Sequence, residues 1–459
     1  MKENAWNKYN EKDLEELETI CNDYKYYLTK CKTEREATKE IIHRAKNSGF
    51  KNLEDYIKDN TSIKAGDKIY VNNHDKAVAL FVIGEEDISK GMNILGAHID
   101  SPRLDLKAMP LYEDSGFAYF DTHYYGGIKK YQWVTLPLAL HGVVVKKDGT
   151  KIDVNIGEDA RDPVVGITDL LPHLGKEQLK KTADVVIEGE NLDVLVGSKE
   201  LKDKEKDKVK ENILKILKEK YDIEEDDLLS SEIEVVPAGS ARDFGLDNSM
   251  IMSYGQDDSA CAYTSLEAFL KVQNPKRTTS CILVDKEEIG SVGKTGMESH
   301  FYDNAIAEIC ALMGMEPTLS VRRILKNSKM LSSDVNAAYD PLYKEAMDSR
   351  NSSYFGQGVV FCKYTGARGK SGSNDASAEY IAKIRKVMDD NNVSFQISEL
   401  GKVDAGGGGT IAYILANYNV DVIDCGVGVL SMHAPWEVTS KSDIYEAYKC
   451  YIAFLKDMK

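Results

Sequence analysis

Histidine and carboxylate side chains follow apolar runs at several places along this sequence of 459 residues. His98 and Asp100 come directly after "NILGA", the adjacent pair Glu287 and Glu288 follows "CILVDK", and Asp334 follows "KMLSS". Such side chains bind hard and borderline metal ions, and catalytic metal sites keep one coordination position open for water. Because α/β sheets place their sites at the carboxyl ends of strands, we expect these residues to meet at one sheet edge.

Two further positions extend this set of metal-binding side chains. Asp257 precedes a helical pattern, and His433 ends the apolar run "CGVGVLSM". Taken singly, each residue has an ordinary explanation, because acids are favoured where helices begin and a lone histidine is usually structural. Together, the two histidines and three carboxylates (Asp257, Asp334 and one glutamate of the pair) are a ligand set for two metal ions. Such ions lie about 3.5–4 Å apart and share one carboxylate, and Asp257 is the candidate for the shared ligand.

The adjacent glutamates suggest a division of roles. Side chains alternate along a strand, so Glu287 and Glu288 are not expected to bind one metal as equivalent ligands. One can bind the metal while the other serves as general base. Asp100 lies two residues after His98, on the same face of an extended segment, and is expected to fix the imidazole tautomer through a hydrogen bond.

The composition narrows the class of protein. With 59 basic and 75 acidic residues, the net charge of −16 argues against a nucleic-acid-binding protein and suits binding of cations or small molecules. The N-terminus shows no secretory signal, and no stretch is long and apolar enough to span a membrane. The eight cysteines include no CxxC pair, which favours reduced thiols and a cytoplasmic location.

The pattern along the chain predicts an α/β protein with an insertion. Helical patterns are followed by strand patterns in residues 1–105, and strand patterns alternate with helical patterns in residues 236–459, which is typical of a sheet with helices on both faces. Residues 106–235 are rich in aromatic and β-branched residues broken by glycine, which indicates short antiparallel strands. We therefore expect a catalytic domain in two parts, interrupted by a β-rich inserted domain.

Five segments in the same order carry a family resemblance: "GAHIDSPRL", "QDDSACAYTSLEA", "DKEEIGSVG", "SSDVN" and "SMHAPWE". They resemble the metalloaminopeptidase family of aspartyl aminopeptidase and vacuolar aminopeptidase I, over nearly the whole chain and in a bacterial-type form. The resemblance implies an aminopeptidase that removes N-terminal residues from peptides at a co-catalytic pair of zinc ions. Cobalt and manganese are alternative metals for such a site.

The resemblance also implies a role for each residue of the site. His98 and Asp334 would bind one zinc, His433 and Glu288 the other, and Asp257 both. Glu287 would be the general base that takes a proton from metal-bound water, and the resulting hydroxide would attack the scissile carbonyl. Asp100 would orient His98.

The family's insertion mediates dimer contacts, and a histidine on it reaches the active site of the neighbouring subunit. His173, in "DLLPHLG", is the matching residue here. The resemblance further implies a homo-oligomer, a tetrahedral dodecamer built from dimers. Lys363, Arg368 and Lys370 lie in a stretch that matches part of the family's specificity region. This stretch is compatible with substrates that have acidic, neutral or basic N-terminal residues.

Two alternative hypotheses come from other classes of protein. "GSVGKTG" partly resembles a phosphate-binding P-loop, but the position that requires the first glycine is occupied by Glu288. A carboxylate there would repel phosphate, which argues against an NTPase. A catalytically inactive assembly protein of the same fold is the other alternative, and the complete ligand set argues against it.

Overall fold

The structure is a computed structural model that describes residues 3–459. The chain divides into two compact units. The first comprises the chain up to Asp100 together with residues 241–432 and 437–459, and the second comprises residues 101–240 and 433–436. None of the helices in residues 3–459 has the length and apolar character needed to cross a membrane.

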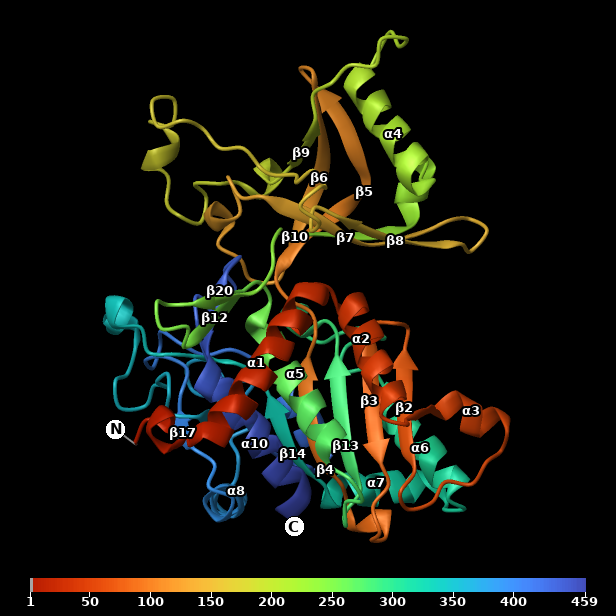
Figure 1. The fold of residues 1–459 in the computed structure, drawn as a ribbon, viewed down its shortest axis with the longest axis vertical. Helices are drawn as coiled ribbons and strands as arrows, with labels where there is room; N and C mark the ends of the chain where they lie inside the picture. Colours follow the sequence, from red (N-terminus) through yellow and green to blue (C-terminus); the bar gives the residue numbers. More distant parts are fainter. Residues whose placement is uncertain (1–2) are drawn as a thin grey trace. The chain divides into compact units, whose positions relative to one another are not determined.

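A nine-stranded mixed sheet forms the centre of the first unit (Figure 1). Its strands, in spatial order, are β1 (Lys51–Asn52), β2 (Lys68–Asn73), β3 (Ala77–Val82), β13 (Thr279–Val284), β4 (Asn93–His98), β14 (Lys329–Ser333), β18 (Asp421–Gly426), β16 (Val359–Cys362) and β17 (Phe395–Ser398). β2 and β3 are consecutive along the chain and pair as an antiparallel hairpin. The central strands β13, β4, β14 and β18 run parallel.

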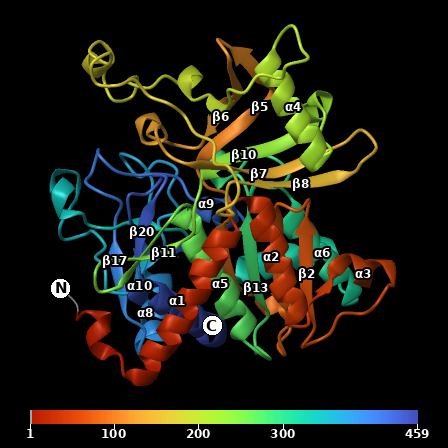
Figure 2. The same ribbon diagram turned by 45° about the horizontal axis from the view of Figure 1, so that its top comes forward.

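Helices cover both faces of this sheet, as the alternating pattern predicts (Figure 2). The helices on one face are α1 (Glu11–Lys30), α2 (Glu34–Asn47), α5 (Gln256–Lys271), α8 (Ala378–Asp390) and α10 (Lys441–Asp457). Those on the other are α3 (Leu53–Lys58), α6 (Phe301–Leu312), α7 (Pro317–Asn327) and α9 (Ala412–Ala416). Side chains alternate between the two cores along each strand, so that Leu283 packs on the first face and Ile282 on the second.

The sequence explains where the long N-terminal helices begin. Asn10 accepts hydrogen bonds from the backbone of Lys12 and Asp13, and the Asp13 side chain accepts one in return, which forms a capping box at the start of α1. The Thr33 hydroxyl accepts a hydrogen bond from the Glu36 backbone N–H and caps the start of α2. Leu17, Cys21 and Tyr24 then recur on one buried stripe of α1.

A smaller sheet in the first unit consists of β11 (Arg242–Phe244), β12 (Met250–Ser253), β20 (Glu437–Ser440), β19 (Gly428–Leu430) and β15 (Asn336–Ala337). β12 and β20 are antiparallel, with Ser253 opposite Glu437. This pairing connects the segment before α5 to the segment before α10.

The second unit contains a six-stranded antiparallel sheet of β8 (Lys151–Ile156), β7 (Leu138–Val145), β10 (Ser231–Pro237), β5 (Arg103–Asp114), β6 (Phe117–Tyr125) and β9 (Val194–Gly197). The aromatic and β-branched composition of this stretch predicts such strands. The charged stretch after β9 includes α4 (Lys208–Tyr221).

Candidate metal centre

Three neighbouring parallel strands end at the predicted metal site. His98 is the last residue of β4, Glu287 and Glu288 follow β13 after two intervening residues, and Asp334 directly follows β14. In the sheet, β4 lies between β13 and β14 and is parallel to both, with Val284 opposite His98. The shared direction of these strands places the side chains at one sheet edge, as expected for an α/β sheet.

His98 lies at the middle of a group of acids. Its Nε2 atom is 3.3 Å from Asp257 Oδ1 and 3.9 Å from both Glu287 Oε2 and Asp334 Oδ1. The ligand atoms of His98, Asp257 and Asp334 all lie within 4.8 Å of one another, and so do those of His98, Glu287 and Glu288. The structure therefore brings together five of the predicted site residues within the first unit.

Asp100 contacts both His98 and the glutamate pair. His98 Nδ1 is 2.9 Å from the Asp100 carbonyl oxygen and 3.4 Å from its Oδ1. The same carboxylate accepts backbone N–H bonds from Glu287 at Oδ1 (3.1 Å) and from Glu288 at Oδ2 (3.2 Å). With a proton on Nδ1, the lone pair of Nε2 points into the group of acids. Asp100 thus acts on the orientation of three neighbouring residues.

The glutamates lie in a turn and not in a strand, so the alternation argument does not apply to them. β13 ends at Val284, and Glu287–Ile289 form one turn of 3-10 helix. This turn is flanked by left-handed residues, Lys286 with φ 69° and Gly290 with φ 97°. The turn exposes both glutamate N–H groups to Asp100 and directs both carboxylates toward His98.

The electrostatics of the centre favour bound cations. The pKa of Asp334 is raised well above its usual value, first by burial and then by repulsion from Asp258 and other acids. Burial alone lowers the pKa of His98, but hydrogen bonds to Asp100 and Asp257 outweigh it and raise that pKa. A cation removes the repulsion between buried carboxylates, and imidazole with carboxylate oxygens is a ligand set that zinc accepts. The residues present therefore fit a zinc site.

Two predicted residues belong to the second unit. His433 lies in the segment 433–436, where its Nδ1 is 2.8 Å from the Gly127 carbonyl oxygen and its φ is 62°. A left-handed histidine is uncommon, and such conformations concentrate at functional sites. His173 is exposed in the turns between Leu171 and Gly175.

Sequence reasoning missed one residue near the centre. Glu437 is buried, at 1% exposed, and its Oε2 accepts the backbone N–H of Asp257 at 3.0 Å. The available signal was an acid at the start of the run "EVTS", all four residues of which are buried in the structure.

The basic residues in the expected specificity region have partners of their own. Lys370 Nζ is 3.1 Å from Asp375 Oδ2 and 3.7 Å from the centre of the Tyr364 ring, and Lys363 Nζ is 3.8 Å from Asp375 Oδ1. Arg368 and Lys370 line a pocket of about 350 Å³.

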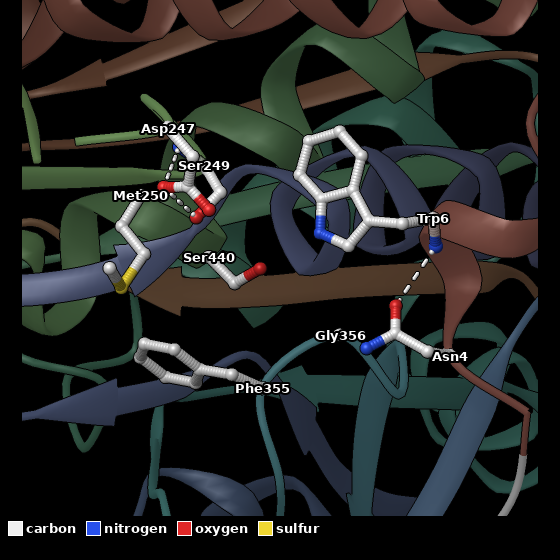
Figure 3. A pocket seen from close by; sticks show the side chains of 8 residues that line it. All are labelled: Asn4, Trp6, Asp247, Ser249, Met250, Phe355, Gly356 and Ser440. Atoms are coloured by element: carbon white, nitrogen blue, oxygen red, sulfur yellow. Dashed lines mark hydrogen bonds between the residues drawn. The ribbon is translucent and has the colours of Figure 1, made fainter. Parts of the chain in front are cut away.

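A second pocket of the first unit, of about 420 Å³, is shown in Figure 3. Trp6, Met250 and Phe355 give it apolar walls, and Asp247 and Ser440 add polar atoms. Its lining shares no residue with the predicted site, so we do not place hydrolysis there.

The structure does not support a P-loop. A phosphate-binding loop leads directly into a helix, whereas α6 begins at Phe301, beyond the "GSVGKTG" segment. The Thr295 hydroxyl, which would face magnesium, donates instead to Asp285 Oδ2 at 2.6 Å.

The fold and the centre together define a metal-dependent hydrolase. A family model described as "Aminopeptidase I zinc metalloprotease (M18)" matches residues 27–455. The chain belongs to this M18 family and is a zinc-dependent aminopeptidase, which confirms the family and the activity that the five segments predict. This assignment does not favour either alternative hypothesis.

Individual relatives agree with this assignment. The chain is 58% identical over 455 residues to "Probable M18 family aminopeptidase 1" of Clostridium acetobutylicum, which covers 99% of this chain and 98% of the relative. It superimposes on the crystal structure of an M18-family aminopeptidase from Thermotoga maritima with a TM-score of 0.94, 46% identity and 99% of each chain covered. A solved mApe1 dodecamer from S. cerevisiae shares 18% identity with a TM-score of 0.78, over 96% of this chain and 97% of that one, which shows a common fold.

Proposed function

We propose that the centre holds two zinc ions and hydrolyses the bond after the N-terminal residue of a peptide. His98 and Asp334 hold one ion, Glu288 and His433 the other, and Asp257 is shared. The observation that carries this proposal is the convergence of His98 with four carboxylates at the ends of adjacent strands. Five ligands with one carboxylate held in common are what a two-metal site requires.

The inclusion of His433 rests on its neighbours along the chain. β19 ends at Leu430 and β20 begins at Glu437, and both strands belong to the first unit. Glu437 contacts the Asp257 backbone, so His433 is four residues along the chain from a residue that contacts the centre. A proton on Nδ1, donated to the Gly127 carbonyl, leaves Nε2 available as a metal ligand.

Zinc would polarise the scissile carbonyl and bring the pKa of a coordinated water toward 7. Glu287 then accepts a proton from the attacking water and returns it to the amine of the departing peptide. Asp100 holds Glu287 in place through the backbone N–H bond and keeps the lone pair of His98 Nε2 directed into the centre. The burial of His98 and Asp257 excludes bulk water from these charges.

A pair of substitutions tests the division of roles between the glutamates. Glu287→Gln should keep both zinc ions and the fold but lower kcat by about 10²–10⁴-fold, the usual contribution of a general base. Glu288→Gln should lose about one zinc per chain. Glu298→Gln is the control, because Glu298 lies in the same segment and its side chain accepts a hydrogen bond from the Tyr413 hydroxyl. Metal content and kcat of each variant are measured, and identical behaviour of the first two would show that the assignment is wrong.

We also propose that the chain assembles into a homo-oligomer, a dodecamer built from dimers, in which the second unit forms dimer contacts. Exposed apolar side chains lie near His173 in the sequence of this unit, namely Leu170, Leu171, Leu174 and Leu179. Twelve copies of a 51.2 kDa chain give about 614 kDa, which light scattering measures directly.

In this assembly His173 reaches the centre of the neighbouring subunit. His173→Ala should therefore lower kcat while the mass of the assembly is unchanged. Leu174→Asp should instead lower the mass, because it places a charge in the proposed contact. A mass of 51 kDa for the unaltered protein would contradict both expectations.

We propose the cytoplasm as the location of the enzyme. All eight cysteines are free and buried in the described chain, which suits a reducing compartment. Cell fractionation with an activity assay tests this location.

A further inference from the structure

The segment that presents Asp257 lacks a cap of its own. α5 begins at Gln256, and the residue before it, Gly255, has φ 70° and no side chain to accept a hydrogen bond. The first backbone N–H groups of a helix have no partner within the helix, and buried donors need one. Asp257 departs from helical geometry, with ψ 105°, so the position of its carboxylate depends on what holds its backbone.

Glu437 supplies the missing acceptor from another element. It lies at the start of β20, and its Oε2 accepts the Asp257 N–H at 3.0 Å across 180 residues of sequence. A carboxylate at the start of a helix is stabilised by the helix dipole and by the charge-assisted hydrogen bond. At 1% exposed, an acid is rarely retained unless it makes such contacts.

The residue before Asp257 is held by the same strand. The Gln256 amide donates to the Glu437 carbonyl oxygen at 2.7 Å and to the Ile251 carbonyl oxygen at 3.1 Å. Its oxygen accepts from the Thr439 hydroxyl at 2.6 Å and the Tyr24 hydroxyl at 3.2 Å. All four hydrogen-bonding positions of this side chain are therefore used, and β20 contacts both the Gln256 side chain and the Asp257 backbone N–H.

We infer that Glu437 is a positioning residue for the zinc centre, which fixes the shared ligand Asp257 through its backbone N–H. This inference rests on the proposed role of Asp257 as a zinc ligand. The chain between β19 and β20 then contributes to the centre at two places: His433 as a proposed ligand, and Glu437, the first residue of β20, as a positioning residue. Zinc affinity, and not only the stability of the fold, depends on Glu437.

Zinc competition against a chelating dye tests this inference on the zinc-loaded protein. Glu437→Ala should weaken zinc affinity by about 10–100-fold, the usual effect of removing a partner of a metal ligand. Glu437→Gln keeps an oxygen acceptor and should lie between the Ala variant and the unaltered protein. Should the Ala variant not fold, Glu437→Asp replaces it, because its carboxylate is withdrawn by one methylene and should also weaken affinity.

The matched control is Glu446→Ala. Glu446 is also 1% exposed and also accepts a backbone N–H, from Ser394 at 2.6 Å, but it lies in α10 and contacts no residue of the centre. It should lower the melting temperature and leave zinc affinity unchanged. Equal zinc affinities of the Glu437 and Glu446 variants would overturn the inference.

Asp257→Asn separates this inference from the proposed function. If this variant binds zinc as tightly as the unaltered protein, the ligand assignment itself fails. If it loses zinc while Glu437→Ala and Glu437→Asp keep full affinity, only the positioning role fails.

Discussion

Asp100 is the residue whose removal tests the organisation of the centre most directly. Its carboxylate accepts the N–H groups of Glu287 and Glu288, at 3.1 and 3.2 Å, and its oxygens lie against His98 Nδ1. A hydrogen bond to a charged group contributes about 1.5–3 kcal/mol. In Asp100→Asn one oxygen becomes an NH₂ group, which cannot accept, so one of the two N–H bonds is lost.

The expected effect of Asp100→Asn is about 2 kcal/mol. This corresponds to about a 30-fold weaker zinc affinity or lower kcat/KM. Asp100→Ala removes both acceptors and should cost about 4 kcal/mol, close to 10³-fold. The graded series separates a positioning effect from a general loss of charge, because Asn and Ala remove the same charge but different numbers of acceptors.

For both variants, zinc affinity is measured by dye competition and kcat/KM is measured with an aminoacyl anilide as substrate. Asp303→Asn is the control, since Asp303 also contacts a histidine, His300 Nδ1 at 3.1 Å, but that histidine is 74% exposed. The control should behave as the unaltered protein. Equal effects of Asn and Ala at position 100, or no effect of either, would refute the reasoning.

Three other predictions concern the metal, the pH dependence and the core. Zinc removal by a chelator should lower the melting temperature and abolish activity. Zinc restored to 1,000 times its dissociation constant should raise the free energy of unfolding by about 4 kcal/mol. A melting curve unaffected by zinc would contradict this prediction. Burial raises the pKa of the Asp443 carboxyl to about 7, although Gly356 and Gly358 donate N–H groups to it. The native chain keeps this proton while the unfolded chain releases it near pH 4, so the free energy of unfolding should fall by up to about 4 kcal/mol between about pH 4 and pH 7. Asp443→Asn should remove this slope in denaturant unfolding measured across pH, and an unchanged slope would show that Asp443 is ionised throughout. Phe269→Ala leaves a cavity at a fully buried position of α5 and should lower the free energy of unfolding, measured by urea titration, by about 3–5 kcal/mol. Zinc affinity should change little, because β20 holds the start of α5.

The sequence predicts the secondary structure and the sheet edge that carries the site, because both follow from local patterns. β4 and β13 contain continuous apolar runs, as expected of parallel strands buried on both faces, and the metal-binding side chains come at or just after the ends of these strands. The layered α/β arrangement follows from the alternation of strands and helices.

Other features depend on contacts between distant residues, and local patterns do not contain them. The change of direction after Val284 depends on Lys286 adopting φ 69°, which is uncommon for lysine, so the local pattern predicts a strand where the glutamates form a turn. The role of Glu437 depends on a partner 180 residues away. The resemblance supplied the role of each ligand, which the spacing alone left open.

The order of the strands in the nine-stranded sheet has a consequence during synthesis on the ribosome. β4 emerges early, yet both of its neighbours, β13 and β14, are encoded more than 180 residues later. Until then its backbone donors and acceptors have no partner strand on either edge, and such apolar segments are prone to aggregate. Nascent chains that stop short of residue 333 therefore expose this segment, and we expect them to depend on chaperones for solubility.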